Sequence, residues 1–210
     1  MTTQASPGVL YIVGAPSGAG KTSLVKALLK ADAAIRLSVS YTTRPPRPGE
    51  HDGRDYHFVS RERFDALLAA GDFLEYAEVY GNFYGTSKDG ISRDLDAGRD
   101  ILLEIDWQGA AQVKQHFPQA TSIFIMPPSA SALRTRLTGR GQDSADVIER
   151  RLAAAANDIA HAGAFDYIIV NDDFDHALQD LVAITRSTRL ATPRQLDRHS
   201  ALFEAFRHTA

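Results

Sequence analysis

The strongest constraint on the fold lies near the start of the chain, where an apolar run, a glycine-rich turn and a helical pattern follow one another. Residues 9–13 (VLYIV) form an uninterrupted apolar run, as expected for a central parallel strand covered on both faces. After the turn, Leu24, Val25, Leu28 and Leu29 recur at the spacing of an amphipathic helix. The order strand, loop, helix predicts an α/β protein.

The turn itself, APSGAGKT at residues 15–22, has the residue types that bind a nucleotide phosphate. Gly18 and Gly20 let successive backbone N–H groups turn toward a phosphate, and the start of the following helix adds a positive dipole. Lys21 can then reach the β and γ phosphates, and the Thr22 hydroxyl can bind Mg²⁺. The pattern departs from GxxxxGK[ST] at Ala15, and a turn that binds nothing is the weaker alternative. The predicted ATP-binding residues here are Ala15, Pro16, Ser17, Gly18, Ala19, Gly20, Lys21 and Thr22.

Strand and helix patterns alternate through most of the chain, which predicts a parallel sheet with right-handed crossovers and flanking helices. A different composition, rich in Pro, Gly, Tyr and charge, marks residues 38–96 as an inserted lobe above the carboxyl edge of that sheet. Extended pieces are predicted within the lobe at 56–59 and 76–84. The other predicted strands are 101–105, 122–126 and 167–170, and the other predicted helices are 108–116, 130–138, 145–161 and one starting near 174.

Composition narrows the class of partner. Lys and Arg number 23 against 26 Asp and Glu, so the net charge of −3 offers no general attraction for a nucleic-acid backbone. No apolar run approaches the roughly 18 residues of a membrane span. The chain has no Cys, which is compatible with a reducing compartment. We expect a cytoplasmic protein that binds small molecules, not nucleic acid or membrane.

The lobe concentrates groups that can hold a phosphate. Its segment SYTTRPPRPGE sets Arg44 and Arg47 around rigid prolines, and two guanidinium groups near tyrosine hydroxyls can hold a dianionic phosphate. A solvated basic loop is the alternative for this segment taken alone. The segment is followed by FLEY at 73–76, GNFYGT at 81–86 and EIDWQG at 104–109. In this order, with the phosphate loop, these motifs resemble those of the guanylate kinases, which are P-loop nucleoside monophosphate kinases.

The resemblance covers residues 8–186 and implies a division of the chain. It implies a core at 8–37 and 97–186, a small mixed α/β lobe at 38–96 that binds GMP, a helical lid at 134–151, and a helical tail at 187–210. The implied activity is reversible transfer of the γ-phosphoryl group from ATP with Mg²⁺ to GMP, giving ADP and GDP, in purine metabolism and GMP recycling. The acceptor could extend to dGMP.

The same resemblance assigns roles to individual residues. It places the GMP phosphate on the two arginines and the tyrosines, and the guanine base on Glu75 beside two hydroxyls, because guanine offers N1–H and N2–H₂ donors that a carboxylate accepts. Each residue also has an ordinary alternative as a surface or turn side chain. The implied GMP-binding residues are Ser40, Arg44, Arg47, Glu50, Tyr56, Glu75, Tyr84, Thr86, Glu104 and Asp106.

Two acidic residues end a predicted core strand and therefore point toward the phosphate loop. Glu104 stands where guanylate kinases commonly have Asp. The resemblance implies a contact with GMP or with magnesium-bound water here, made by a side chain that is longer by one methylene group. Asp106 has two roles that do not exclude each other: a contact to magnesium through water, or the N-cap of the helix that follows.

Arginines crowd around a glycine-flanked loop at 138–144, as expected for a lid that closes over transferring phosphate. Arg136, Arg140 and Arg151 match the lid arginines of the family and, with Lys21, are the implied catalytic residues, whereas Arg134 and Arg150 are better explained as a solvated helix face. Asn171 follows the last core strand and is the implied contact for the adenine of ATP. Helix capping explains Asp172 or Asp173 equally well.

Alternatives remain for the function and for the tail. A kinase of the same shape could use another phosphate-bearing acceptor, against which the guanine-reading residues argue. A non-catalytic guanylate-kinase-like module that binds phosphopeptides is a second alternative, against which the intact Lys21, Thr22, Arg136 and Arg140 argue. The tail is expected to pack on the core or on a second subunit, which would make a homo-oligomer.

Overall fold

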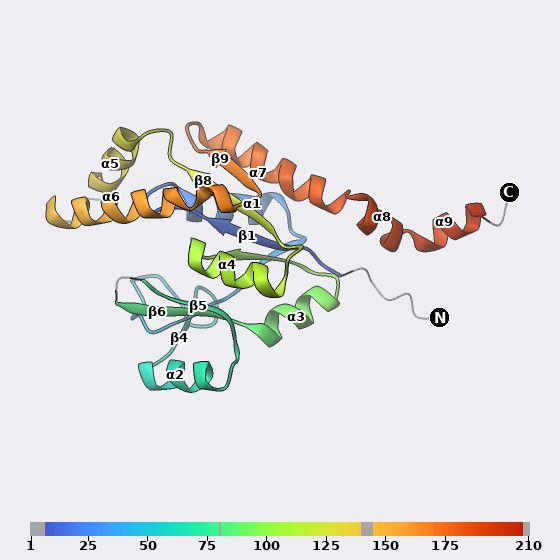
Figure 1. The fold of residues 1–210 in the computed structure, drawn as a ribbon, viewed down its shortest axis with the longest axis horizontal. Coiled ribbons are helices and arrows are strands. Elements are labelled where there is room, and N and C mark those ends of the chain that lie inside the picture. Colours follow the sequence, from blue (N-terminus) through green and yellow to red (C-terminus); the bar gives the residue numbers. More distant parts are fainter. Residues whose placement is uncertain (1–6, 80, 140–144, 208–210) are drawn as a thin grey trace.

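A parallel sheet of five strands forms the centre of the molecule (Figure 1). The computed structural model describes residues 7–79, 81–139 and 145–207. In the sheet, every neighbouring pair is parallel, and the strand order β2-β7-β1-β8-β9 places the first apolar run in the middle. The strands are β1 (Leu10–Gly14), β2 (Ile35–Leu37), β7 (Asp100–Glu104), β8 (Thr121–Met126) and β9 (Tyr167–Val170).

Helices cover both faces of this sheet, which is why the central strands are apolar throughout. All five residues of β1 are buried. On one face, β1 packs with Leu24 and Leu28 of α1 (Lys21–Ala31) and with Leu181 of α7 (Phe174–Arg189). The other face is covered by α3 (Lys88–Asp96) and α4 (Trp107–His116), which contribute a second apolar cluster. The predicted α/β class with a parallel sheet and flanking helices is confirmed.

The predicted core elements are close to the observed ones because their ends are marked in the sequence. Helix α5 (Ala130–Thr138) and strand β9 have the predicted bounds. The side chain of Ser129 accepts the N–H of Ala132 at the start of α5. In the same way Asp173 accepts the N–H of His176 and begins α7. The capping alternative for Asp173 is therefore confirmed.

The lobe has more regular structure than its composition predicted. It contains a second sheet of order β4-β3-β6-β5, in which β5 and β6 form an antiparallel hairpin and β3 joins β6. Helix α2 packs against this sheet through Phe64, whose ring lies 4.6 Å from that of Phe73. Neither α2 nor α3 was predicted, because each helix has only nine residues and its few buried apolar residues stand among charged ones. The elements are β3 (Tyr41–Thr42), β4 (His57–Phe58), α2 (Arg61–Ala69), β5 (Phe73–Val79) and β6 (Asn82–Ser87).

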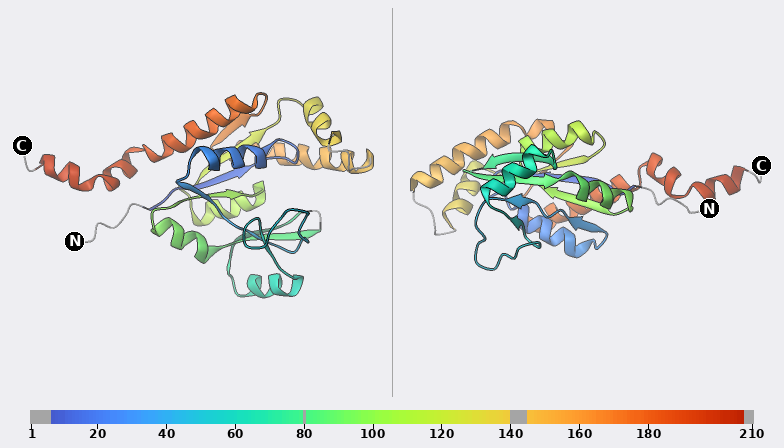
Figure 2. Two further views of the ribbon diagram at one scale, coloured as in Figure 1. Left: turned by 180° about the vertical axis from the view of Figure 1, so that it is seen from behind. Right: turned by 90° about the horizontal axis from the view of Figure 1, so that it is seen from below.

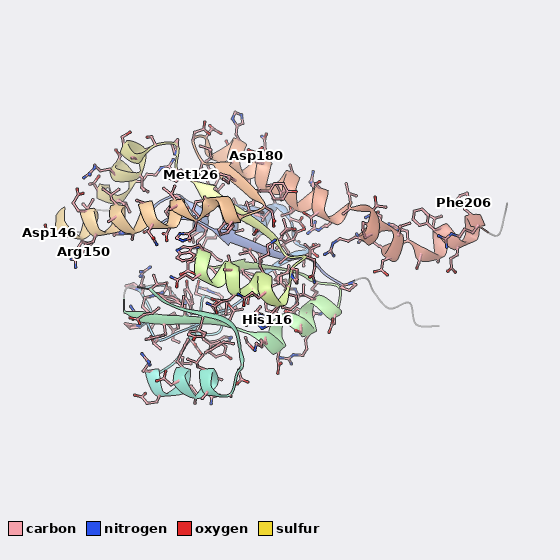
Figure 3. The ribbon with its side chains drawn as sticks, in the orientation of Figure 1. His116, Met126, Asp146, Arg150, Asp180 and Phe206 are labelled. Carbon is pink, nitrogen blue, oxygen red and sulfur yellow. The ribbon has the colours of Figure 1, made fainter. Side chains whose placement is uncertain are left out.

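Two helices project beyond the carboxyl edge of the central sheet and contain the described residues of the segment predicted as a lid, 134–151. Helix α5 packs against α6 (Ala145–Ala160) through Leu133, Leu137 and Ala155. Residues Asp146 and Arg150 lie near the far end of α6 (Figure 3). The loop between the helices includes Arg140, which lies outside the described residues.

The tail continues from α7 as two short helices, α8 (Thr192–Arg198) and α9 (Ser200–Arg207). Arg189 ends α7 and is fixed to the core by ion pairs of 2.5 Å with Asp32 and with Asp100. Beyond this anchor the chain leaves the body of the molecule, as both views of Figure 2 show. Neither α8 nor α9 has a buried residue. Packing on the core, one of the two expectations for the tail, therefore does not hold for α9.

Within the described part of the chain, no helix is both long and apolar enough to cross a membrane.

Candidate active site

A cleft of about 470 Å³ separates the carboxyl edge of the central sheet from the lobe and from α6. The phosphate loop forms its floor, the lobe forms one wall and α6 forms another. Most of the sequence-predicted site residues line it, although they come from segments far apart in the chain. The predicted residues that line the cleft are Ala15, Pro16, Ser17, Gly18, Gly20, Lys21, Thr22, Ser40, Tyr56, Glu75, Tyr84, Glu104 and Asp106.

The phosphate loop has the backbone that a phosphate cradle requires. Gly18 and Gly20 have φ values of 91° and 96°, which side chains with a Cβ rarely adopt. Helix α1 begins at Lys21, so its free N–H groups face the cleft. The Lys21 ammonium group donates to the carbonyl oxygen of Ile105 at 3.3 Å, at the end of the neighbouring strand. The loop therefore presents backbone donors and one cation to the same space.

Asn171 holds the phosphate loop in place through its side chain. Its side-chain amide donates to the carbonyl oxygen of Ala19 at 2.7 Å, and only 5% of the residue is exposed. A Cβ on Gly20 would lie 2.4 Å from the same amide nitrogen, so the glycine is required by packing as well as by its φ value. The described contact of Asn171 is thus with the loop, and its contact with adenine stays a prediction.

Two acidic residues after β7 have different partners. The Thr22 hydroxyl donates to the Glu104 carboxylate at 2.5 Å, so the extra methylene of Glu104 reaches the phosphate loop. Asp106 accepts the N–H of Gly109 at 2.8 Å and is the N-cap of α4. The capping role predicted for Asp106 is confirmed, and its role toward a metal stays a prediction.

The predicted base-reading groups form one hydrogen-bonded chain. Thr86 donates to Glu75 at 2.5 Å, and the Ser40 hydroxyl lies 3.1 Å from that of Thr86. Glu75 is 3% exposed, and this burial raises the pKa of its carboxyl group to about 7, with a smaller contribution from the nearby carboxylate of Asp106. A Cβ on Gly109 would lie only 2.6 Å from one carboxylate oxygen of Glu75, so the glycine leaves room for this side chain. A buried acceptor beside two hydroxyls can distinguish nucleobases by their donors.

The predicted phosphate-binding groups lie on the same lobe. Arg44 is buried and forms two hydrogen bonds with the Glu50 carboxylate, at 2.9 and 3.0 Å, and one with the carbonyl oxygen of Pro45 at 2.7 Å. The rings of Tyr56 and Tyr84 lie 6.0 Å apart, edge to face. Because a carboxylate would repel a phosphate, Glu50 can serve the site by orienting Arg44 rather than by direct contact. Arg47 is exposed, and its backbone N–H donates to Glu50.

Two of the predicted lid arginines touch the phosphate loop. Arg136 donates to the carbonyl oxygens of Asn171 at 2.9 Å and Ala19 at 3.4 Å. Arg151 donates to the Ser17 hydroxyl at 2.7 Å. Arg134 instead pairs with Glu149 on the exposed surface, as a solvated helix face requires. Arg136 and Arg151 thus contact the phosphate loop, whereas Arg134 does not, and the role of the first two toward a nucleotide phosphate stays a prediction.

Sequence reasoning missed the contribution of α6 and of Trp107 to the cleft. Asn157 and Asp158 line it from α6, and Trp107 lines it from the start of α4. The Trp107 ring stacks on His161 with centroids 3.5 Å apart and planes at 5°. Arg151 and Asp158 share one side of α6, and His161 follows the end of that helix, a spacing that was visible in the sequence but pointed to no ligand by itself.

Comparisons with known proteins agree with this geometry. The family model described as guanylate kinase matches residues 8–188. A guanylate kinase of Thiobacillus denitrificans is 79% identical over 207 residues, covering 99% of each chain, and one of Dechloromonas aromatica is 59% identical, covering 94% of this chain and 98% of the relative. The crystal structure of guanylate kinase from Anaplasma phagocytophilum superposes with a TM-score of 0.76 at 38% identity, covering 92% of each chain. The chain belongs to the guanylate kinase family.

Proposed function

We propose that this protein transfers the γ-phosphoryl group of ATP to GMP, reversibly, and so returns GMP to the guanine nucleotide pool of the cytoplasm. The observation that carries the proposal is the single cleft in which a phosphate loop faces the Ser40–Thr86–Glu75 chain. A P-loop alone indicates a bound nucleoside triphosphate, and the buried carboxylate adds a second site that selects guanine.

The two substrates would occupy opposite sides of the cleft. ATP would place its phosphates on residues 15–22, with Arg136 and Arg151 from the lid and Asn171 near its base. GMP would place guanine on Glu75 of the lobe. Its phosphate would lie on lobe side chains too, namely Arg44, Arg47, Tyr56 and Tyr84. The core, the lobe at 38–96 and the lid at 134–151 would then act as three parts that close together, which excludes water and aligns the two phosphates.

The reaction needs little covalent chemistry from the protein. The phosphate of GMP is already an anionic nucleophile, so no general base is required, and catalysis consists of positioning and neutralising charge. Lys21 and the backbone N–H groups of the phosphate loop would hold the transferring group, while Arg151, already at the Ser17 hydroxyl, would approach it from the lid.

We also propose that Mg²⁺ accompanies ATP. The oxygen donors at the loop fit this ion, because the Thr22 hydroxyl lies 2.5 Å from the Glu104 carboxylate beside the cradle. Within the described residues no group of three or more His, Cys, Asp or Glu side chains forms a metal cage. Mg²⁺ commonly keeps waters and substrate phosphates as ligands, so Thr22, with Glu104 or Asp106 through water, would suffice. When bound, the ion would neutralise charge on the phosphates.

A coupled assay of ADP formation tests the function directly. With ATP and Mg²⁺ we expect turnover with GMP and little with AMP, CMP or UMP, because Glu75 accepts from donors that the edge of adenine lacks. Turnover of another nucleotide in preference to GMP would contradict the proposed base site. Binding of GMP without turnover would instead indicate a non-catalytic module.

For the tail we propose self-association with a second copy of the chain. Helices of seven and eight residues are marginal in water without a packing partner. Five apolar side chains of this region are exposed, from 42% for Phe203 to 71% for Phe206 at the tip (Figure 3). They are Leu190, Leu196, Leu202, Phe203 and Phe206. A second tail offers the same apolar surface, as a twofold interface requires.

Charged substitutions in α9 test this proposal. We expect the double variant Leu202→Glu, Phe206→Glu to be a monomer in light scattering at concentrations where the unchanged protein is a dimer or larger. Glu204→Gln, on the same helix, should keep the oligomer. The turnover per chain at saturating substrate should stay within about twofold, because the cleft lies in the body of the molecule. An unchanged protein that is monomeric at every concentration would overturn the proposal.

A further inference from the structure

One partly buried carboxylate in the cleft has no partner among the described residues. Four carboxylates of the cleft are buried or partly buried: Glu75, Glu104, Asp106 and Asp158. The first three accept hydrogen bonds from Thr86, Thr22 and the N–H of Gly109. In the part of the chain that the structure describes, the side chain of Asp158 has no hydrogen bond or ion pair. Partial burial of a charged group without a partner lowers the stability of the fold, so the presence of this carboxylate in a cleft points to a ligand that pairs with it.

The surroundings of Asp158 agree with this reading. Burial is the main reason why the pKa of its carboxyl group is raised to about 6, and the nearby Asp106 carboxylate raises it further. The charges of Lys21 and His161 act in the opposite direction. Asp158 thus has Asp106, Lys21 and His161 as charged neighbours, and a hydrogen-bond donor from a ligand would stabilise its carboxylate.

The position along α6 indicates which part of a substrate lies there. Arg151 touches Ser17 of the phosphate loop, and Asp158 follows seven residues later on the same side, about 10 Å further along the helix axis. There the stack of His161 on Trp107 holds the end of α6 beside the start of α4. Gly109 of α4 in turn lies against Glu75. Asp158 is therefore at the end of the cleft that holds the acceptor base, opposite the lobe.

The ribose of the acceptor nucleotide is the one portion for which no contact has been assigned on the lobe. Guanine is assigned to Glu75, Ser40 and Thr86, and the phosphate to the arginine and tyrosine side chains, all of which lie on the lobe. The ribose joins these two ends, and its 2′- and 3′-hydroxyls are the remaining donors. Carboxylates accept hydrogen bonds from ribose hydroxyls in other nucleotide-binding proteins. We propose that Asp158 binds the ribose 2′-hydroxyl of the acceptor nucleotide and so favours GMP over dGMP, which lacks that hydroxyl, an inference that rests on the proposed function.

Steady-state kinetics with three acceptors tests this proposal. The unchanged protein should have a KM for dGMP about tenfold above that for GMP, the loss expected for one hydrogen bond to a charged group. Asp158→Asn and Asp158→Ala should raise the KM for GMP by a similar factor and leave the KM for dGMP within about twofold. IMP, which keeps the ribose and lacks the 2-amino group, should respond to both variants as GMP does.

Matched controls separate binding from folding. Asp180→Asn makes the same change on the exposed face of α7 (Figure 3) and should leave every KM unchanged. The KM for ATP should also be unchanged in the Asp158 variants. Their thermal midpoints should not fall, because the partly buried carboxylate has no side-chain partner among the described residues.

Three outcomes would overturn the proposal, and a fourth concerns the function itself. Equal KM values for GMP and dGMP in the unchanged protein would exclude a ribose contact. A similar rise for both acceptors in the variants would indicate a general electrostatic effect. A rise for GMP but not for IMP would move the contact to the 2-amino group. Failure of the unchanged protein to use GMP at all would reject the proposed function instead.

Discussion

Replacement of Lys21 by alanine is expected to lower kcat with ATP and GMP by about a thousandfold, the range seen when a group that stabilises transition-state charge is removed. The reason is its place in the cleft. The ammonium group is held 3.3 Å from the carbonyl oxygen of Ile105, at the carboxyl edge of the sheet and next to the phosphate loop. Stopped or coupled assays of ADP formation measure the effect.

The loss should not come from unfolding. Lys21 is the first residue of α1, where a positive charge opposes the helix dipole, so its removal should leave the thermal midpoint unchanged or slightly higher. Lys26→Ala, on the exposed side of the same helix, is the matched control and should keep full activity. A Lys21→Ala variant with more than about a tenth of the original kcat would mean that the cradle does not hold the transferring phosphate.

The second large effect is expected from Glu75→Gln, which should weaken GMP use and stabilise the fold. A glutamine amide cannot accept from both N1–H and N2–H₂ of guanine, so the KM for GMP should rise by about a hundredfold and the preference over AMP should shrink. Because Thr86 and Ser40 remain, the pocket itself should persist. Initial rates with GMP and AMP measure the change in preference.

The stability effect of Glu75→Gln depends on pH, and its sign follows from the carboxyl group. Burial raises the pKa of Glu75 from 4.5 to about 7, so the folded state holds its proton more tightly than the unfolded state does. This contribution to stability is complete below about pH 4.5 and is lost as the pH rises through about 7. At pH 8 the Glu75 carboxylate is therefore charged and buried, which lowers the free energy of unfolding by about 3 kcal/mol, at 1.36 kcal/mol for each pKa unit.

Glutamine removes that charge, so the free energy of unfolding of the variant should exceed that of the unchanged protein at pH 8, and the difference should shrink toward pH 5. Urea unfolding at both pH values measures it. Glu204→Gln, which neutralises an exposed carboxylate on α9, should show no such difference. A Glu75→Gln protein that is less stable at pH 8 would contradict this expectation. It would show that hydrogen-bond donors stabilise the Glu75 carboxylate by more than its burial destabilises it.

Local sequence was enough to place the core and much of the candidate site. The apolar run at β1, the glycine turn and the helical pattern after it are contiguous, and each end is marked by a residue with a specific backbone role. Gly20 is a clear example, since its φ value of 96° and its contact with Asn171 both exclude a side chain. The ordered motifs of the lobe likewise pointed to residues that the structure gathers around one cleft.

The lobe helices and the exposed tail were less predictable, because their packing partners determine them. Helix α2 has four charged residues among its nine, and Phe64 packs it against a sheet whose strands come from both before and after it in the chain. In α9 the apolar residues were compatible with a helix packed on the core or on a second subunit. Nothing local distinguishes a face that meets the core from one that projects into solvent.

The sequence by itself determined the α/β class, the phosphate loop and the set of polar residues that surround the cleft, because these depend on short-range backbone conformation and on motifs of fixed spacing. The tertiary structure alone decided which of them touch. It buried Glu75 against Thr86 and raised its pKa, joined Glu104 to Thr22 across 82 positions, and brought Asp158 of α6 into the cleft with no side-chain partner among the described residues. These properties depend on desolvation and on contacts between distant segments, which the order of residues encodes only through the complete fold.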